Sequence, residues 1–321
     1  GSDGTIYASG TDYHVYAVNS DGTQKWRFKT DNSYPSSPII GNNGIIYASG
    51  TKLYAINPDG TQKWKSSFGT FYSNAPVLGS DGTIYAGGAG GDGKLYAINS
   101  DGTQKWIFDK GNTSGFMSLA IGADGTIFGT AGFGLYAVNA NGTKKWSLEL
   151  NDDGGLGHPV IGSDGTIYLT SFFSKLRAFN SGGTLKWERL LPEIPGFARI
   201  IFGADGTLFI AIGNKGLFAY NADATVLKWR FDFGGQLPSP TIGSDGTIYV
   251  GGGGGNVAGK LYALNSDGTK KWEFATVGDP TQYQGSGNSS PSALASDGTI
   301  YFSSSDGNLY ILDGQNKEIS V

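Results

Sequence analysis

His158 and Arg199 are the residues of this 321-residue chain whose types and positions could do chemistry. An imidazole and a guanidinium could bind an anionic or polar ligand, because Arg offers parallel donors to a carboxylate or phosphate. The alternative is that Arg199 pairs with a neighbouring carboxylate and that His158 is solvated. Other copies of an internal repeat carry small residues at the same place: Ser37, Ala75, Ser118 and Ser239. Acidic residues nearby could join the site: Asp152, Asp153 and Glu193.

Large apolar residues accompany these positions in the adjoining loops. They could form an aromatic rim that binds a peptide or a sugar, or they could pack locally within longer loops. The residues concerned are Phe116, Phe133, Phe172, Phe173, Phe197 and Tyr283. The Gly-rich loops at 87–93 and 251–259 lead into strands and not into a helix, so we interpret them as flexible hairpins and not as phosphate-binding loops.

An eightfold internal repeat must position these side chains. One copy reads GSDGTIY at 79–85 and KLYAINSDGTQKW at 94–106. Seven copies end in a tryptophan, and successive tryptophans lie 38 to 43 residues apart, the length of a four-stranded propeller blade. These are Trp26, Trp64, Trp106, Trp146, Trp187, Trp229 and Trp272, which we expect to dock neighbouring blades. The pattern predicts an all-β, eight-bladed β-propeller, a single domain over 1–321 with units at about 1–35, 36–73, 74–116, 117–156, 157–197, 198–237, 238–289 and 290–321.

Each repeat reads as four strands, A to D, which the third copy places at 75–78, 83–86, 95–98 and 104–108. Ser-Asp-Gly turns join A to B and C to D, because Asp can cap its own backbone and Gly can adopt positive φ. The repeated Asp-Gly-Thr offers too few acidic oxygens for a calcium loop. Strand D alternates, with Trp106 and Phe108 on one face and Lys105 and Ile107 on the other, as expected of a half-exposed outer strand.

The two ends of the chain interrupt this regularity. The first copy starts at the A–B turn, so its blade has three strands or its inner strand lay upstream in a longer chain. The tail at 313–321 is too short to cross the disc and then pair as the missing inner strand. Residues 317–321 are therefore predicted to be strand D of blade eight, without the tryptophan.

Composition excludes several classes of function. The net charge is −4 and the pI is near 5.2, which argues against nucleic acid as a partner. There is no cysteine, which excludes disulfides, thiolate metal sites and cysteine nucleophiles. No apolar run approaches the roughly 20 residues that span a bilayer. The Ser-, Thr- and Asn-rich surface weakly favours an extracellular, periplasmic or cell-surface location, and we expect a monomer.

The repeat also resembles a known family. Ala17, Asn19, Thr23, Lys25 and Trp26 are this chain's version of the tryptophan-docking motif of the PQQ-like repeats found in quinoprotein dehydrogenases and in the outer-membrane assembly factor BamB. The dehydrogenases add a vicinal cysteine pair, a calcium site of Glu, Asn and Asp, and a catalytic Asp around the quinone. This chain lacks cysteine and has no acidic cluster on its inner strands. The resemblance therefore implies that this chain belongs to the non-catalytic branch of the family and binds no cofactor. Only under the alternative of a dehydrogenase would the chain bind PQQ with calcium.

The loops indicate where binding would occur. The A–B and C–D turns are nearly identical in all copies, whereas the B–C and D–A loops vary in length and composition. Variable loops on a rigid frame commonly carry binding residues. We therefore predict a non-catalytic binding scaffold, part of a larger protein, that recognises a protein, peptide or glycan through its B–C and D–A loops. The alternatives are a PQQ-dependent dehydrogenase, a BamB-like assembly factor and a lectin.

Overall fold

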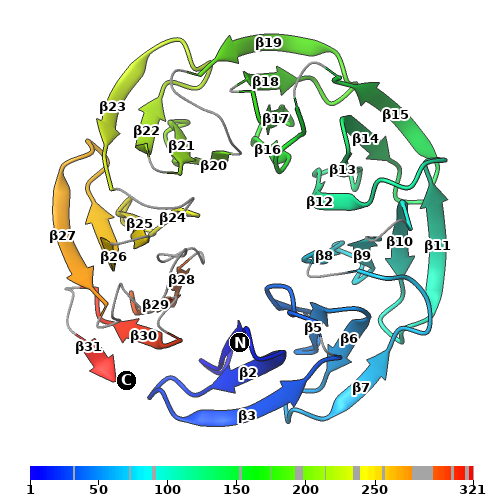
Figure 1. Ribbon diagram of the computed structural model, residues 1–321, viewed down its shortest axis with the longest axis horizontal. Helices are drawn as coiled ribbons and strands as arrows, with labels where there is room; N and C mark the ends of the chain where they lie inside the picture. Colours follow the sequence, from blue (N-terminus) through cyan, green and yellow to red (C-terminus); the bar gives the residue numbers. More distant parts are fainter. Residues whose placement is uncertain are drawn as a thin grey trace. The chain divides into compact units, whose positions relative to one another are not determined.

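The computed structural model describes the chain except for residues 32, 72–73, 89–91, 152–153, 174, 192–197, 214, 234–238, 255–256, 277–291, 305–306, 315–317 and 321. Within the described residues, every regular element is a β-strand, and the strands form eight sheets (Figure 1). Seven sheets have four strands and the first has three. The fold is therefore the eight-bladed β-propeller that the repeat predicts, with a first blade that lacks its inner strand. No helix in this part of the chain has the length and apolar character needed to cross a membrane.

Each sheet is one blade, numbered in chain order, and blades 1 to 4 lie in the first of two compact units, residues 1–169 with 179–185. Their strands are β1 (Ile6–Ser9), β2 (His14–Val18), β3 (Gln24–Lys29), β4 (Ile39–Ile40), β5 (Ile46–Ser49), β6 (Leu53–Ile56), β7 (Gln62–Lys65), β8 (Val77–Leu78), β9 (Ile84–Gly87), β10 (Lys94–Ile98), β11 (Gln104–Asp109), β12 (Phe116–Ile121), β13 (Ile127–Ala131), β14 (Gly134–Val138) and β15 (Lys144–Glu149).

Blades 6 to 8 lie in the second unit, residues 170–178 with 186–321. Their strands are β20 (Ala198–Phe202), β21 (Leu208–Ile212), β22 (Gly216–Tyr220), β23 (Leu227–Phe231), β24 (Thr241–Ile242), β25 (Ile248–Gly254), β26 (Val257–Leu264), β27 (Lys270–Ala275), β28 (Ala293–Leu294), β29 (Ile300–Ser303), β30 (Leu309–Leu312) and β31 (Glu318–Ser320). Blade 5 contributes residues to both units through β16 (Val160–Ile161), β17 (Ile167–Thr170), β18 (Lys175–Phe179) and β19 (Leu185–Leu190).

Blade 3 illustrates how one repeat folds. Its strands β9, β10 and β11 agree with the predicted B, C and D strands to within one residue at each end. The inner strand β8 begins at Val77, two residues later than predicted. In β11, Trp106 and Phe108 are half-buried and buried, whereas Lys105 and Ile107 are exposed, so the predicted alternation is confirmed.

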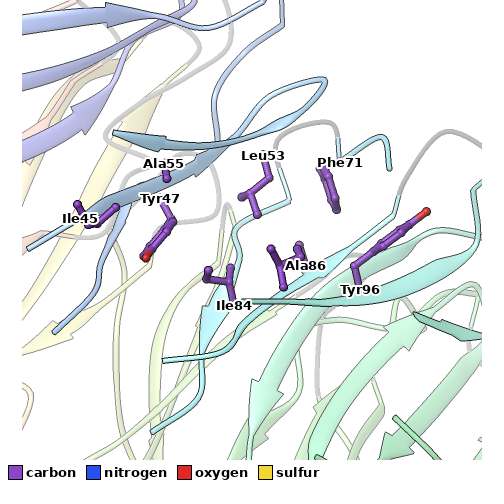
Figure 2. Packing of buried hydrophobic residues seen from close by; sticks show 9 residues of the cluster. Ile45, Tyr47, Leu53, Ala55, Phe71, Ile84, Ala86 and Tyr96 are labelled. Atoms are coloured by element: carbon purple, nitrogen blue, oxygen red, sulfur yellow. The ribbon is translucent and has the colours of Figure 1, made fainter. Parts of the chain in front are cut away.

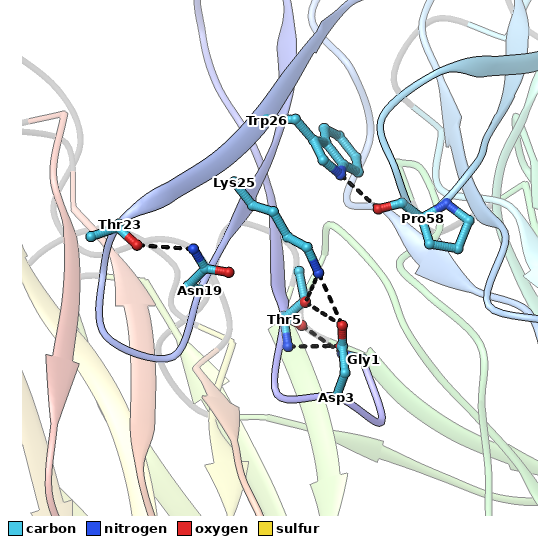
Figure 3. A network of polar contacts seen from close by, with 8 residues as sticks. All are labelled: Gly1, Asp3, Thr5, Asn19, Thr23, Lys25, Trp26 and Pro58. Carbon is cyan, nitrogen blue, oxygen red and sulfur yellow. Dashed lines mark hydrogen bonds and ion pairs between the residues drawn. The ribbon is translucent and has the colours of Figure 1, made fainter.

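The turns adopt the predicted Asx geometry, which Figure 3 shows for blade 1. The N–H and the hydroxyl of Thr5 donate to the two carboxylate oxygens of Asp3, at 3.0 and 2.8 Å. Lys25, on β3, donates to Asp3 and to the Thr5 hydroxyl, each at 3.0 Å. The bonds from Thr5, reinforced by Lys25, hold the pKa of Asp3 well below its usual range. These carboxylate oxygens are thus engaged inside the blade. The same links join Lys105 to Asp81 and Lys145 to Asp124.

The tryptophans join consecutive blades. Trp64 lies against Tyr47 of its own blade, with ring centroids 5.8 Å apart, and its Nε1 donates to the carbonyl of Ser100 in the next blade at 3.0 Å. Gly102 follows in the same turn, and a Cβ there would lie 2.8 Å from the indole, so only glycine allows this close approach. The same Nε1 bond to the next blade is made by Trp26, Trp64, Trp106, Trp146 and Trp229.

The hydrophobic core lies between consecutive blades. Figure 2 shows the cluster between blades 2 and 3, where strands β5 and β6 face β9 and β10. Its members include Ile45, Tyr47, Leu53 and Ala55 of blade 2, Ile84, Ala86 and Tyr96 of blade 3, and Phe71 from the connecting loop. Each blade is therefore stabilised mainly by its neighbours, as in other repeat proteins.

The C-terminal strand confirms the prediction for the tail. β31 pairs with β30 through Ile311 with Ser320 and Leu312 with Glu318, as the outer strand of blade 8. Ser320 occupies the register position that Trp106 holds in blade 3.

Candidate functional site

Each blade has two unlike ends: the turn end carries the A–B and C–D turns, and the loop end carries the B–C and D–A loops. Four of the nine predicted binding residues are described, and all four lie at or near the loop ends of blades 5 and 6: His158, Phe172, Phe173 and Arg199. His158 belongs to the first unit and the other three to the second. The other five lie outside the described residues: Asp152, Asp153, Glu193, Phe197 and Tyr283.

His158 lies just before β16 and is half-buried. Its Nδ1 lies 2.6 Å from the hydroxyl oxygen of Ser118 on β12, so one hydrogen is shared between the side chains of blades 4 and 5. This contact fixes the ring, which differs from the alternative of a freely solvated imidazole.

Two exposed apolar residues lie at the loop end of blade 4, one of them in a bulge beside Ser118. The pairing of β12 with β13 shifts between Phe116 and Ser118, so Met117 is the extra residue. The exposed fraction of Met117 is 60%, and that of Phe133, in the B–C loop, is 48%. Phe116 is fully buried, in contact with Tyr136, so its assignment to an aromatic rim was wrong.

In the second unit, Phe172 and Phe173 form an edge-to-face pair in the B–C loop of blade 5, with centroids 5.7 Å apart, and both rings are exposed. Arg199, on β20, pairs with Ala211 of β21. Its Nε is buried without a hydrogen-bond partner, and no carboxylate among the described residues pairs with the guanidinium. Burial lowers the pKa of Arg199. A cation in this setting could bind an anionic group.

A polar cleft of about 290 Å³ lies between blades 3 and 4. Asn112 accepts hydrogen bonds from Lys110 at one wall, through its Oδ1 at 2.6 Å and its carbonyl at 3.1 Å. At the opposite wall Tyr136 donates to Glu149 at 3.0 Å, and burial together with this bond raises the pKa of Tyr136 to about 12. Ser147 also lines the cleft, where other blades carry a longer residue after the tryptophan: Arg27, Lys65, Ile107, Glu188, Arg230 and Glu273. The small serine therefore leaves this cleft open.

The described residues offer little for binding a metal ion. They contain no cluster of three or more His, Asp or Glu side chains that could hold an ion. The chemistry that they do offer at the loop ends is apolar contact, one tethered imidazole and one buried guanidinium.

Comparisons with known proteins identify relatives. The family model described as outer membrane protein assembly factor BamB matches residues 11–172 and 172–318. Among solved structures, BamB from Moraxella catarrhalis is 17% identical, with a TM-score of 0.69 over 96% of this chain and 91% of that chain. Virginiamycin B lyase from Staphylococcus aureus is 17% identical, with a TM-score of 0.65 over 86% and 93%. The computationally designed Ika8 protein is 9% identical, with a TM-score of 0.75 over 96% and 92%. No curated protein matches the chain. At these identities the structural likeness shows the fold alone, and fold and family together are those of a propeller binding scaffold.

Proposed function

The chain belongs to the family of outer membrane protein assembly factor BamB, and from this membership and its unlike blade ends we propose that it is a non-catalytic scaffold that binds another protein through its loop ends. The partner we propose is an outer membrane protein chain that is not yet folded. This places the proposed activity outside the cytoplasm, in the periplasm or at the inner face of an outer membrane.

One observation carries the proposal, namely the apolar surface exposed at the loop end of blade 4. Met117 and Phe133 expose 60% and 48% of their surface there. Exposed apolar side chains of this size favour contact with a partner, and Met adapts to partners of different shape. At the turn ends, acidic side chains are engaged by Thr and Lys of the same blade, and blade 6 exposes Val226 and Leu227 there.

The spacing of apolar residues in outer membrane proteins favours a partner that is extended or unfolded. Strands of outer membrane proteins alternate apolar and polar residues, so an unfolded chain offers apolar side chains at regular spacing. Weak apolar contacts suit a carrier that must release its cargo, because a small number of exposed residues limits the affinity.

The test uses a fluorescently labelled outer membrane β-barrel protein, diluted from urea into buffer with the full chain. We expect saturable binding that the double variant Met117→Ser, Phe133→Ser weakens about tenfold, equivalent to about 1.4 kcal/mol. The matched control is Val226→Ser, Leu227→Ser, which removes apolar residues of similar exposure, 57% and 45%, at the turn end of blade 6. The control should bind as the unmodified chain does. Equal losses in both variants, or no binding at all, would refute the proposal.

The non-catalytic part has its own test. The chain is incubated with PQQ and Ca²⁺ and assayed for dye-coupled alcohol oxidation. We expect no oxidation above the protein-free blank. A stoichiometric quinone chromophore with turnover would refute this part and favour the dehydrogenase alternative.

A further inference from the structure

The polar cleft between blades 3 and 4 lies within the first unit and shares no residue with the apolar surface of the proposed function. Its lining carries two ammonium groups, Lys110 and Lys144, and two carboxylates, Asp109 and Glu149, so these four charges cancel. Burial lowers the pKa of Lys110, and Asp109 and Glu149 oppose this shift, so the ammonium group lies within electrostatic reach of both carboxylates. A ligand of either sign would meet a like charge in the cleft, which favours a neutral ligand.

In other blades a long side chain of the outer strand fills the equivalent space. In blade 2 this residue is Lys65, the register partner of Tyr54. The Nζ of Lys65 lies 5.6 Å from the centre of the Tyr54 ring and 2.9 Å from a carboxylate oxygen of Asp31. The register partner of Tyr136 in blade 4 is Ser147, whose side chain is too short to lie over the ring. The position of Lys65 holds an ion-paired side chain in blades 5, 6 and 7: Glu188, Arg230 and Glu273.

The loop that connects blades 3 and 4 also leaves this space open. At the preceding interface, Phe68 stacks on Tyr96 with ring centroids 5.5 Å apart. Lys110 is the equivalent of Phe68, since each lies four residues after the tryptophan of its repeat. The Nζ of Lys110 donates to Asn112 at 2.6 Å and lies 5.6 Å from the centre of the Phe116 ring. The interface of blades 3 and 4 therefore lacks both the stacked ring and the long outer side chain.

The carboxylates of the cleft keep acceptor atoms that no described residue uses. Tyr136 donates to Oε1 of Glu149 at 3.0 Å, and Oε2 has no hydrogen-bond partner in the described part of the chain. The N–H of Gly111 donates to Oδ1 of Asp109 at 2.8 Å, and Oδ2 is likewise unused by the described residues. Each carboxylate is thus held in place by one oxygen and can accept a hydrogen bond from a ligand with the other.

Donor groups in the same cleft are also unused. In blade 7, Lys270 donates to Glu273 at 2.8 Å. Lys144 is the equivalent of Lys270, but Ser147 stands at the position of Glu273. The ammonium group of Lys144 and the hydroxyl group of Ser147 therefore form no hydrogen bond with any described residue. The cleft offers these donors to a ligand together with the free carboxylate oxygens.

We propose that this cleft binds one pyranose ring of an uncharged saccharide. Each sugar hydroxyl can donate and accept a hydrogen bond, so it can use the free acceptors and the free donors of the cleft. Phe108, whose ring centroid lies 6.5 Å from that of Tyr136, adds apolar surface for the C–H groups of the sugar ring. The volume of about 290 Å³ is at the low end for ligand pockets, which span about 300 to 1,000 Å³, so it limits the ligand to one ring.

The experiment titrates four neutral sugars into the isotope-labelled full chain and follows the amide resonances by NMR: glucose, galactose, mannose and N-acetylglucosamine. At least one sugar should shift the amides of Asn112, Ser147 and Glu149 along a saturable curve for one site. The uronate and the amino sugar that correspond to it add one negative or one positive charge, and both should bind no more tightly than the neutral sugar. The absence of a saturable shift in the cleft, or tighter binding of either charged sugar, would overturn the proposal.

A variant that fills the cleft tests its location. Ser147→Lys introduces in blade 4 the side chain that blade 2 has at Lys65, so it should weaken binding of the sugar at least tenfold. Ile107→Lys is the matched control, because Ile107 holds the same register position in blade 3 and does not line the cleft. This control should bind the sugar with unchanged affinity. Equal losses in the two lysine variants would rule out the cleft as the site.

A second variant tests the hydrogen bonding without changing the shape of the cleft. Glu149→Gln replaces an acceptor by a donor and should weaken binding about tenfold, with an unchanged circular dichroism spectrum. The double variant Met117→Ser, Phe133→Ser should bind the sugar as the unmodified chain does, because neither residue lines the cleft. Failure of the proposed function would therefore leave this inference standing, and the reverse is also true. Sugar binding that is unaffected by Glu149→Gln, or that is lost in the double variant, would refute the inference.

Discussion

Blades 2 to 5 and 7 have a glycine in the C–D turn that lies against the tryptophan of the preceding blade, and blade 6 has Ala224 in this place. Among these glycines, Gly102 is the position to test for sensitivity to an added methyl group. Its φ is +89°, in the left-handed region. A Cβ built there would lie 2.8 Å from Cδ2 and 2.9 Å from Cγ of Trp64. Both atoms belong to the rigid indole, which is held by its hydrogen bond to Ser100. The ring cannot move away without losing that bond.

Two effects therefore add when Gly102 is replaced by Ala. The left-handed backbone costs a residue with a Cβ about 1–2 kcal/mol. Overpacking against the indole adds about 1–3 kcal/mol. The free energy of unfolding should thus fall by about 2–5 kcal/mol, a large part of the stability of a folded domain.

Gly82 in the same blade is the matched control. It has the same turn chemistry and a φ of +80°, but a Cβ there would meet no atom within 4 Å. Gly82→Ala should lose only the backbone part, about 1–2 kcal/mol. The difference between the two variants measures the contact with Trp64.

The assay is urea unfolding of both variants and the unmodified chain, followed by far-UV circular dichroism. It is repeated in a Trp64→Ala background, where the indole is missing and Gly102→Ala should cost no more than Gly82→Ala. Equal losses in the original background, or a difference that survives removal of the indole, would refute the docking role of this glycine.

Two further predictions concern polar groups. The Nε1–H of Trp229 donates to the carbonyl of Ser266, whereas the Nε1 of Trp272 is buried with no hydrogen-bond partner among the described residues. Trp229→Phe should therefore lower the free energy of unfolding by about 1–3 kcal/mol more than Trp272→Phe does. Equal losses in thermal unfolding would contradict this. The Thr83 N–H and Lys105 lower the pKa of Asp81 from 3.8 to about 2, so stability from this carboxylate is present above pH 4 and lost as pH falls to 2. Asp81→Asn should flatten the pH dependence of unfolding in that window, and an unchanged slope would count against it.

Local chemistry explains why much of this fold could be predicted from the sequence. The Asp-Gly turns and the alternating outer strands depend on residues close in sequence, so blade 3 and the pairing of β31 follow from reading one repeat. The contact between His158 and Ser118 and the burial of Phe116 could not be predicted, because they depend on which side chains the next blade presents. Met117 was missed for the same reason, since a bulge is a property of two paired strands.

The irregularities of this chain affect the blades that pack against them. In a repeat protein, an incomplete unit weakens the unit that packs on it. The C–D turn of blade 8 reads Asp-Gly-Gln-Asn-Lys at 313–317, with Asn316 where blades 2 to 5 and 7 have a glycine against the preceding tryptophan. In blade 7, the Nε1 of Trp272 is buried with no hydrogen-bond partner among the described residues. Likewise Ile40, in the blade next to the one for which the described residues form three strands, is 40% exposed. Asn316→Gly should therefore slow the hydrogen exchange of the Trp272 indole more than that of any amide within blade 8.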